Sequence, residues 1–174
     1  MSQVIVITAV GRDRPGIIAA LAEAMYDLGG NLDDASMTRL HGAFAAMLSA
    51  RLPANRTPED ARAALAPVGE RLALSLTVQS VADLPPAETP PDHLLSVYGA
   101  DKPGIVHRVA SRLAARGVNI TDMDTRVAGA EDAPIYVMLL EVAAGEADLA
   151  GDLAALRGEL GVDIALHPLE SEAL

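Results

Sequence analysis

Two short segments of the chain combine residue types that could bind a small charged molecule. Residues 11–18 read GRDRPGII, and residues 99–106 read GADKPGIV, 88 positions later. Each segment holds a carboxylate, a cation and a Pro-Gly pair, and an asparagine follows it, Asn31 or Asn119. The asparagine amide both donates and accepts hydrogen bonds, and the aspartate can take a positive charge. This set of groups suits the ammonium and the carboxylate of a free amino acid.

The Pro-Gly pair of each segment is expected to open a helix. Apolar residues recur at helical spacing directly after it, at Ile17, Leu21 and Met25 in the first half. The proline is expected at the first helical position, where its fixed φ fits, and the glycine leaves the backbone open to a ligand. The N-terminus of a helix presents unpaired N–H groups and partial positive charge, which suit a carboxylate.

The same residues also have a purely structural interpretation. Aspartate is a common turn or capping residue, proline presets φ, and glycine permits a tight entry into a helix. An asparagine after a glycine is typical of a turn. A binding site further requires each asparagine to lie near its Pro-Gly segment. This is an assumption, because the two lie on strands that need not be neighbours.

The two segments belong to a longer internal repeat. Residues 11–38 align without gaps with residues 99–126, and nine of the 28 positions are identical. A further match, between residues 38–40 (TRL) and 125–127 (TRV), has a spacing of 87 instead. A one-residue slip would turn side chains to the other face of a sheet unless a bulge absorbs it, so this match is either a bulge or a coincidence.

Hydrophobic patterns and turn residues predict the same order of elements in each half. In the first half, strands are expected at 3–10, 31–42, 43–53 and 72–81, and helices after Pro15 and at 56–72. In the second half, strands are expected at 93–99, 119–129, 133–143 and 162–168, and helices after Pro103 and from about 145 to 161. Thr57 is expected to cap the helix at 56–72, and Pro67 to kink or break it late.

The order βαββαβ in each half predicts an α+β fold with two ferredoxin-like units. Each unit would be an antiparallel four-stranded sheet with both helices on one face. The expected domains are 1–82 and 93–170. Residues 83–92 (DLPPAETPPD) include four prolines and are expected to form a stiff, extended linker.

Composition excludes several function classes. The net charge of −11 repels phosphate backbones, so direct nucleic-acid binding is not expected. The absence of cysteine removes disulfides and thiolate chemistry. No apolar stretch reaches the length of a membrane span and no signal sequence is evident, so a soluble, cytoplasmic protein is expected.

Neither a metal site nor a catalytic site is expected. The spacings of the four histidines match no metal motif, and the acidic pairs at 33–34 and 122/124 offer too few oxygen ligands for a divalent cation. No nucleophile elbow, phosphate-binding loop or dinucleotide fingerprint occurs. No cofactor and no enzymatic activity are therefore predicted.

The D-R/K-P-G-I segment at a strand–helix junction, followed by G-x-N-I/L, resembles the ACT domain. Nearly the whole chain is covered, as two copies. Two such units without an attached enzyme most resemble the glycine cleavage system transcriptional repressor family. The resemblance implies small regulatory modules that bind amino acids, usually between two domains whose sheets join edge to edge into eight strands. It also implies action through a DNA-binding protein rather than through DNA.

Carried over by position, the resemblance implies two ligand sites. These comprise Asp13, Arg14, Pro15, Gly16, Ile17 and Asn31 in the first half, and Asp101, Lys102, Pro103, Gly104, Ile105 and Asn119 in the second. The implied ligand is a free amino acid such as glycine or serine, and the implied partner is a protein such as a transcription factor. A homo-oligomer is expected. The copies differ at Arg12/Ala100 and Gly30/Val118, which leaves open whether both sites bind.

Two other functions stay open at this point. The repeats could serve as an assembly module that binds no ligand, in which case the Pro-Gly segments are only helix starts. A small enzyme would instead require a deep pocket with a base such as His107.

Overall fold

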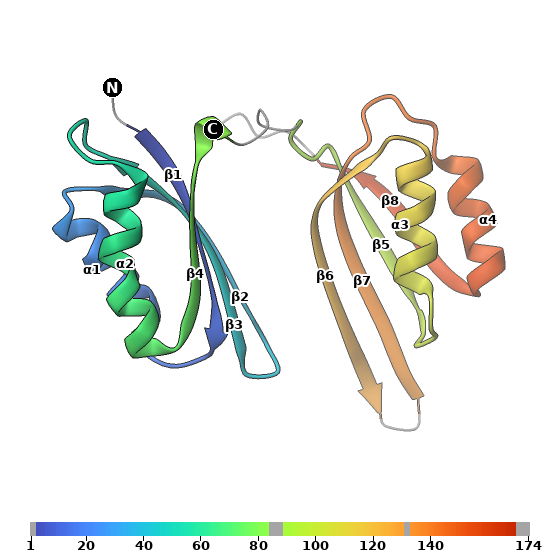
Figure 1. The fold of residues 1–174 in the computed structure, drawn as a ribbon. Coiled ribbons are helices and arrows are strands. Elements are labelled where there is room, and N and C mark those ends of the chain that lie inside the picture. Colours follow the sequence, from blue (N-terminus) through green and yellow to red (C-terminus); the bar gives the residue numbers. More distant parts are fainter. Residues whose placement is uncertain (1–2, 84–88, 131–132, 170–174) are drawn as a thin grey trace. The chain divides into compact units, whose positions relative to one another are not determined.

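The computed structural model describes residues 3–83, 89–130 and 133–169. The chain divides into two compact units between residues 86 and 87. Each unit is one sheet of four strands with two helices on one face (Figure 1). The predicted α+β class with two ferredoxin-like units is confirmed.

The first unit follows the predicted order closely. Its elements are β1 (Gln3–Arg12), α1 (Ile17–Asp27), β2 (Asn31–Leu40), β3 (Ala43–Leu52), α2 (Pro58–Leu72) and β4 (Leu74–Ser80), with a short 3₁₀ turn at Val81–Asp83. The strand order is β2-β3-β1-β4, and neighbouring strands are antiparallel. The strands at the two edges of the sheet are therefore β2 and β4.

The second unit repeats this architecture. Its elements are β5 (His93–Ala100), α3 (Ile105–Ala115), β6 (Asn119–Ala130), β7 (Ala133–Ala143), α4 (Ala150–Leu160) and β8 (Val162–Pro168). The strand order β6-β7-β5-β8 corresponds strand for strand to that of the first unit.

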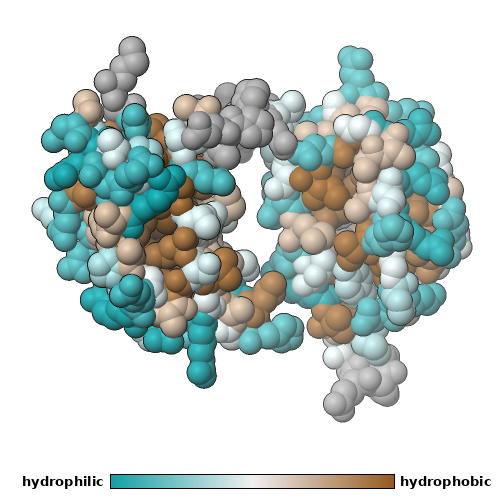
Figure 2. Space-filling model, viewed as in Figure 1, coloured by the Kyte–Doolittle hydropathy of each residue, from teal (hydrophilic) through white to brown (hydrophobic). Residues whose placement is uncertain are grey.

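Each unit has its own hydrophobic core between sheet and helices. In β1, Ile5, Ile7 and Ala9 are fully buried, while alternate residues such as Val10 face the uncovered side of the sheet. The helix α1 buries its predicted apolar stripe against this layer. Figure 2 shows hydrophobic residues among hydrophilic ones on the visible surface of both units. Val10 and Met47 on the uncovered face of the first sheet are 52% and 58% exposed, so this face is not purely polar.

The helix α2 begins as predicted but does not break at its proline. Thr57 is the N-cap: its hydroxyl accepts a hydrogen bond from the N–H of Asp60 at 3.2 Å, and its own N–H donates to the Asp60 carboxylate at 2.8 Å. Of the expected kink or break at Pro67, the break is wrong, because the helix continues to Leu72. Pro67 lies on the exposed side of α2, where water can satisfy the carbonyl that loses its N–H partner.

The same β-bulge occurs in both units and settles the register of the repeat. The pairing shifts between Leu32 and Asp34 in β2 and at the corresponding place, between residues 120 and 122, in β6. Both strands therefore keep the offset of 88, and Thr38 corresponds to Arg126. The match with a spacing of 87 is a coincidence.

The second unit includes the end of the predicted linker. Asp92 donates its backbone N–H to the carbonyl of Val142, and its carboxylate accepts from the N–H groups of Ala144 and Gly145 at 2.8 and 2.6 Å. These bonds hold the chain after β7 in a turn, so α4 begins at Ala150 rather than near 145 as expected. The Pro-rich stretch at 84–88 lies outside the described residues. None of the described helices is long and apolar enough to cross a membrane.

Candidate functional site

Each Pro-Gly segment joins the end of a central strand to the first helix of its unit. Gly16 and Gly104 are the N-cap residues of α1 and α3, with φ values of 89° and 93°. The prolines therefore precede the cap, and the prediction that Pro15 and Pro103 take the first helical position is wrong. The reason is conformational, because the left-handed φ at the cap is accessible to glycine at little cost.

The space around both cap glycines is open. Among the described residues, apart from the chain neighbours of each glycine, no heavy atom lies within 4 Å of the position that a Cβ would take at Gly16 or Gly104. No side chain caps either helix, and the first turn closes through backbone bonds, such as the one from the N–H of Ala20 to the carbonyl of Gly16 at 3.0 Å. The first N–H groups of both helices thus meet an unfilled surface, which suits an anionic group.

In the first unit, an ion pair links the Pro-Gly segment to the end of β2. The carboxylate of Asp13 lies 3.3 Å from the guanidinium of Arg39, and the backbone N–H of Asp13 donates to the carbonyl of Gly42 at 2.9 Å. These groups border an open hollow of about 560 Å³, whose lining residues are Asp13, Met37, Thr38, Arg39, His41 and Gly42. Among these, only Asp13 is a predicted site residue.

The hairpin that borders this hollow has an unusual backbone. Both residues between β2 and β3 have positive φ, 48° at His41 and 82° at Gly42, as two-residue hairpins of the primed type require. Histidine at such a position is uncommon, because its Cβ is strained there. His41 lines the same hollow as the Asp13–Arg39 pair.

In the second unit, a hollow of about 450 Å³ lies at the start of α3 instead, and its lining residues are Lys102, Gly104, Ile105, Val106, His107 and Tyr136. Three of them are predicted site residues. The Lys102 ammonium donates to the carbonyl of Leu160 at 3.3 Å, at the negative end of α4. His107 contacts the hydroxyl of Ser111 at 3.4 Å. The hollow is open to solvent.

The asparagines lie at the opposite end of each sheet from the Pro-Gly segments. Asn31 on β2 pairs with Arg51 on β3, and Arg51 in turn pairs with Val4 on β1. Gly11, where the Pro-Gly segment begins, lies seven residues beyond Val4 along β1. At about 3.3 Å per residue, Asn31 therefore lies about 23 Å from Gly11 along the sheet. The Asn31 amide donates to Asp33, which forms an ion pair with Arg51 at 3.0 Å. Within one unit the structure does not bring the asparagine to the segment, and the same register holds for Asn119.

The remaining predicted residues fall into two groups. Ile17 and Ile105 are each 2% exposed and pack into the cores, so they anchor the first turns of α1 and α3 to the sheets. Arg14 and Asp101 are exposed beside the cap glycines. Arg39 and Tyr136 were missed by sequence reasoning, because only strand pairing places them next to the segments.

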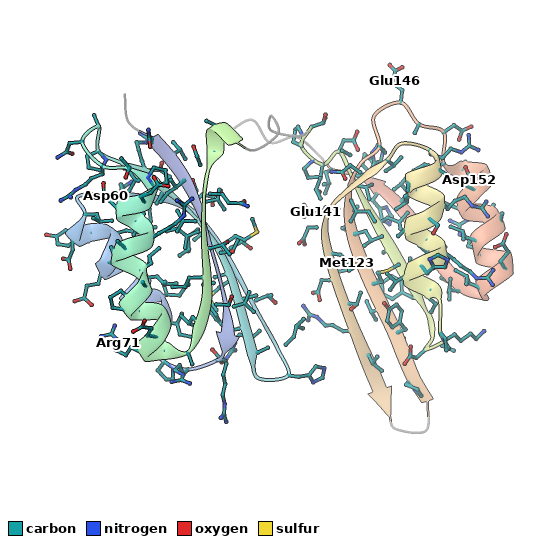
Figure 3. All side chains as sticks on the ribbon, in the orientation of Figure 1. Asp60, Arg71, Met123, Glu141, Glu146 and Asp152 are labelled. Atoms are coloured by element: carbon teal, nitrogen blue, oxygen red, sulfur yellow. The ribbon has the colours of Figure 1, made fainter. Side chains whose placement is uncertain are left out.

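An ion-pair network further distinguishes the helices of the second unit. Arg112 contacts Asp152 at 3.0 Å and Glu159 at 3.4 Å, and Arg116 contacts Asp152 at 2.5 Å. The hydrogen bonds from Arg112 and then Arg116 lower the pKa of Asp152, which is labelled at the start of α4 in Figure 3. The corresponding positions of α1 are Ala24 and Leu28. Ion pairs therefore link the helices of the second unit in addition to their apolar packing, whereas the equivalent positions of α1 are apolar.

Family models and known proteins agree with this architecture. The model of the ACT domain matches residues 3–79, and a second ACT domain model matches residues 93–161. A UPF0237 protein of Methanopyrus kandleri is 33% identical over 75 residues, which cover 42% of this chain and 83% of that protein.

Two solved structures cover both units. An unknown protein from Galdieria sulphuraria is 26% identical with a TM-score of 0.80, over 97% of this chain and 99% of that one. A protein named as a glycine cleavage system transcriptional repressor is 19% identical with a TM-score of 0.67, over 97% of this chain and 98% of that one. The second likeness shows the shared fold alone.

Proposed function

Because the chain belongs to the ACT domain family, with two ACT domains in tandem, we propose that it is a regulatory protein that binds a free amino acid. ACT domains are regulatory domains that bind small molecules. The observation that carries the proposal is the pair of uncapped helix starts, each opened by a left-handed glycine. A hollow lies at Asp13 of the first Pro-Gly segment, and another lies at Lys102 and Gly104 of the second. Glycine and serine are the ligands of suitable size and charge.

The edge strand β2 supports a site that is completed by a second copy of the unit. Residues 34–40 of β2 are exposed, and an edge strand offers unpaired N–H and C=O groups. An antiparallel pairing of two β2 strands about their middle would place Asn31 of one copy opposite Leu40 of the other. The asparagine would then lie at the end of the sheet that carries the Pro-Gly segment. Ligand binding and homo-oligomer formation would be coupled through this contact.

The output of the protein is proposed to be a contact with another protein rather than a reaction. The net charge of −11 supports a protein partner, such as a transcription factor, over direct binding to nucleic acid. The likeness to a protein named as a glycine cleavage repressor supports regulation of glycine or general amino-acid metabolism in the cytoplasm, by analogy of fold.

The alternative function is assembly without a ligand. Edge strands such as β2 and β6, together with half-exposed apolar residues such as Met47 on the uncovered face, favour it. On this alternative the chain would associate equally in the presence and absence of any amino acid.

The test is a thermal-shift screen of the full chain against the twenty amino acids at millimolar concentration, followed by sedimentation with and without each hit. A ligand at 100 times its dissociation constant adds about 2.7 kcal/mol of stability, which raises the melting temperature by several degrees. A selective rise that accompanies a change in association supports the proposal. Unchanged melting and association for all twenty would contradict it and favour the assembly module.

A further inference from the structure

The hollow of the first unit places two opposite charges where a single small ligand could contact both. Asp13 belongs to the Pro-Gly segment and Arg39 to the end of β2, 26 positions later. The register brings them together, because Arg39 pairs with Phe44, and Phe44 pairs with Gly11. The bond from the Asp13 N–H to the Gly42 carbonyl fixes the segment against the hairpin. The side chains of Asp13 and Arg39 thus approach each other from a segment and a strand whose backbones are both fixed by hydrogen bonds.

We propose that this pair binds a free amino acid by both of its charges, with the ammonium on Asp13 and the carboxylate on Arg39. The inference rests on the proposed function and names the groups that recognise the ligand in the first unit. Arg39 is the added residue, since neither the repeat nor the Pro-Gly segment assigns it a role. A zwitterion inserted between the two side chains satisfies both at once.

The ion pair can open for a ligand at little cost. The side chain of Arg39 is 67% exposed and that of Asp13 is 32% exposed, and ion pairs this accessible to water add little to stability. The guanidinium has five N–H donors in a planar fork, which can bind a carboxylate through two parallel hydrogen bonds. Replacing one weak contact by two charge-assisted contacts favours the bound state.

The other residues of the hollow favour a small ligand with an uncharged side chain. Met37, which is 51% exposed, offers an apolar contact, and Thr38 and His41 offer hydrogen-bonding groups. The space of about 560 Å³ is open to water, so a large apolar side chain would gain little burial there. Glycine and serine fit these conditions.

The second unit lacks this arrangement. The counterpart of Arg39 is Val127, which is 59% exposed, and the neighbouring Arg126 pairs with Asp124 at 2.6 Å on the other face of the sheet. Among the described residues, Asp101 has no ion-pair partner. The second unit therefore cannot bind the carboxylate of an amino acid in the way inferred for the first.

The test is calorimetric titration of the full chain with glycine, L-serine, acetate and methylamine. Acetate keeps only the carboxylate of glycine, and methylamine keeps only the ammonium. Glycine or serine is expected to bind, and both analogues to bind about 10–100-fold more weakly, as for the loss of one charge-assisted contact. Equal binding of methylamine and glycine would overturn the role of Arg39.

Matched variants separate the two units. Arg39→Gln and Asp13→Asn are expected to weaken binding of glycine or serine about 10–100-fold without lowering the melting temperature, because both side chains meet solvent. Arg126→Gln, which removes a similar exposed ion pair from β6, is expected to leave binding unchanged.

Binding by the Arg39→Gln variant and binding by the wild-type chain test different claims. Normal binding by the Arg39→Gln variant would overturn the inference while the proposed function stands. A failure of the wild-type chain to bind any amino acid would overturn both.

Discussion

At the scale of single residues, the glycine at the start of each first helix has a conformational role that is separate from ligand binding. Gly16 has a φ of 89°, and the space beside it is open, so an added methyl group would meet no atom but would strain the backbone. The same holds for Gly104. A substitution there therefore tests backbone strain without steric clash.

We expect Gly16→Ala to lower the free energy of unfolding of the first unit by about 1–2 kcal/mol, the usual cost of a left-handed non-glycine residue. Gly158→Ala is the matched control, because Gly158 lies within α4 with an equally open surrounding and no left-handed φ. It is expected to stabilise by about 0.5–1 kcal/mol. Urea denaturation measures both, and equal effects of the two changes would contradict the assignment.

Residue-level prediction succeeded where chemistry is local and failed where it depends on pairing. The D-R/K-P-G segments lie at strand–helix junctions as expected, because turn and cap preferences act within a few residues. Arg39 was missed, because its approach to Asp13 depends on the register of three strands. The assumed nearness of Asn31 does not hold within a unit for the same reason.

At the scale of elements, Asp92 connects the start of β5 to the turn after β7. Its carboxylate accepts hydrogen bonds from His93 and from the N–H groups of Ala144 and Gly145. The His93 hydrogen bond first, and then the backbone N–H of Ala144, lower the pKa of Asp92 from 3.8 to about 2. The carboxylate thus determines where the chain leaves the sheet before α4.

A lowered pKa gives a stability contribution that is complete above pH 4 and disappears as the pH falls from about 4 to about 2. We expect Asp92→Asn to melt below the wild type at neutral pH, and the difference to shrink steadily toward pH 2. Melting curves across this range measure it. Asp163→Asn, an exposed change on β8, is the control and should give no such difference. A difference in melting temperature between Asp92→Asn and wild type that stays constant down to pH 2 would contradict the role of the carboxylate.

The elements themselves were largely predictable from the sequence. Apolar patterns located the central strands and the edge strands β4 and β8, because these strands bury one face against a helix-covered core. The exposed edge strands β2 and β6 were located from the glycines that end the preceding helices. The start of α4 was placed too early, since the bonds from Asp92 to Ala144 and Gly145 connect residues 52 and 53 positions apart. Pro67 was overestimated as a helix breaker, because its effect depends on whether water can reach the carbonyl it leaves free.

At the scale of the whole molecule, the two hydrophobic cores share no residue. Leu48 is 1% exposed in the first core, and its counterpart Leu140 is 1% exposed in the second. Leu48→Ala should lower the free energy of unfolding of the first unit by about 2–5 kcal/mol and leave that of the second unchanged. Leu140→Ala should do the reverse.

Urea denaturation of the full chain, followed by hydrogen exchange in each unit, measures these effects. Each variant serves as the control for the other. A single transition that both changes shift equally would show that the units unfold as one.

The hairpin at the end of the sheet that carries the Pro-Gly segment differs between the two units. Two residues separate Leu40 from its partner Ala43, whereas six separate the corresponding pair, Ala128 and Ile135. The bulge at the other end of these strands is the same in both units. The two units therefore differ in length at the end of the sheet that carries the hollows. A change confined to that end, with the strands and helices of the unit unchanged, can give one of two similar units a different ligand specificity or abolish its binding.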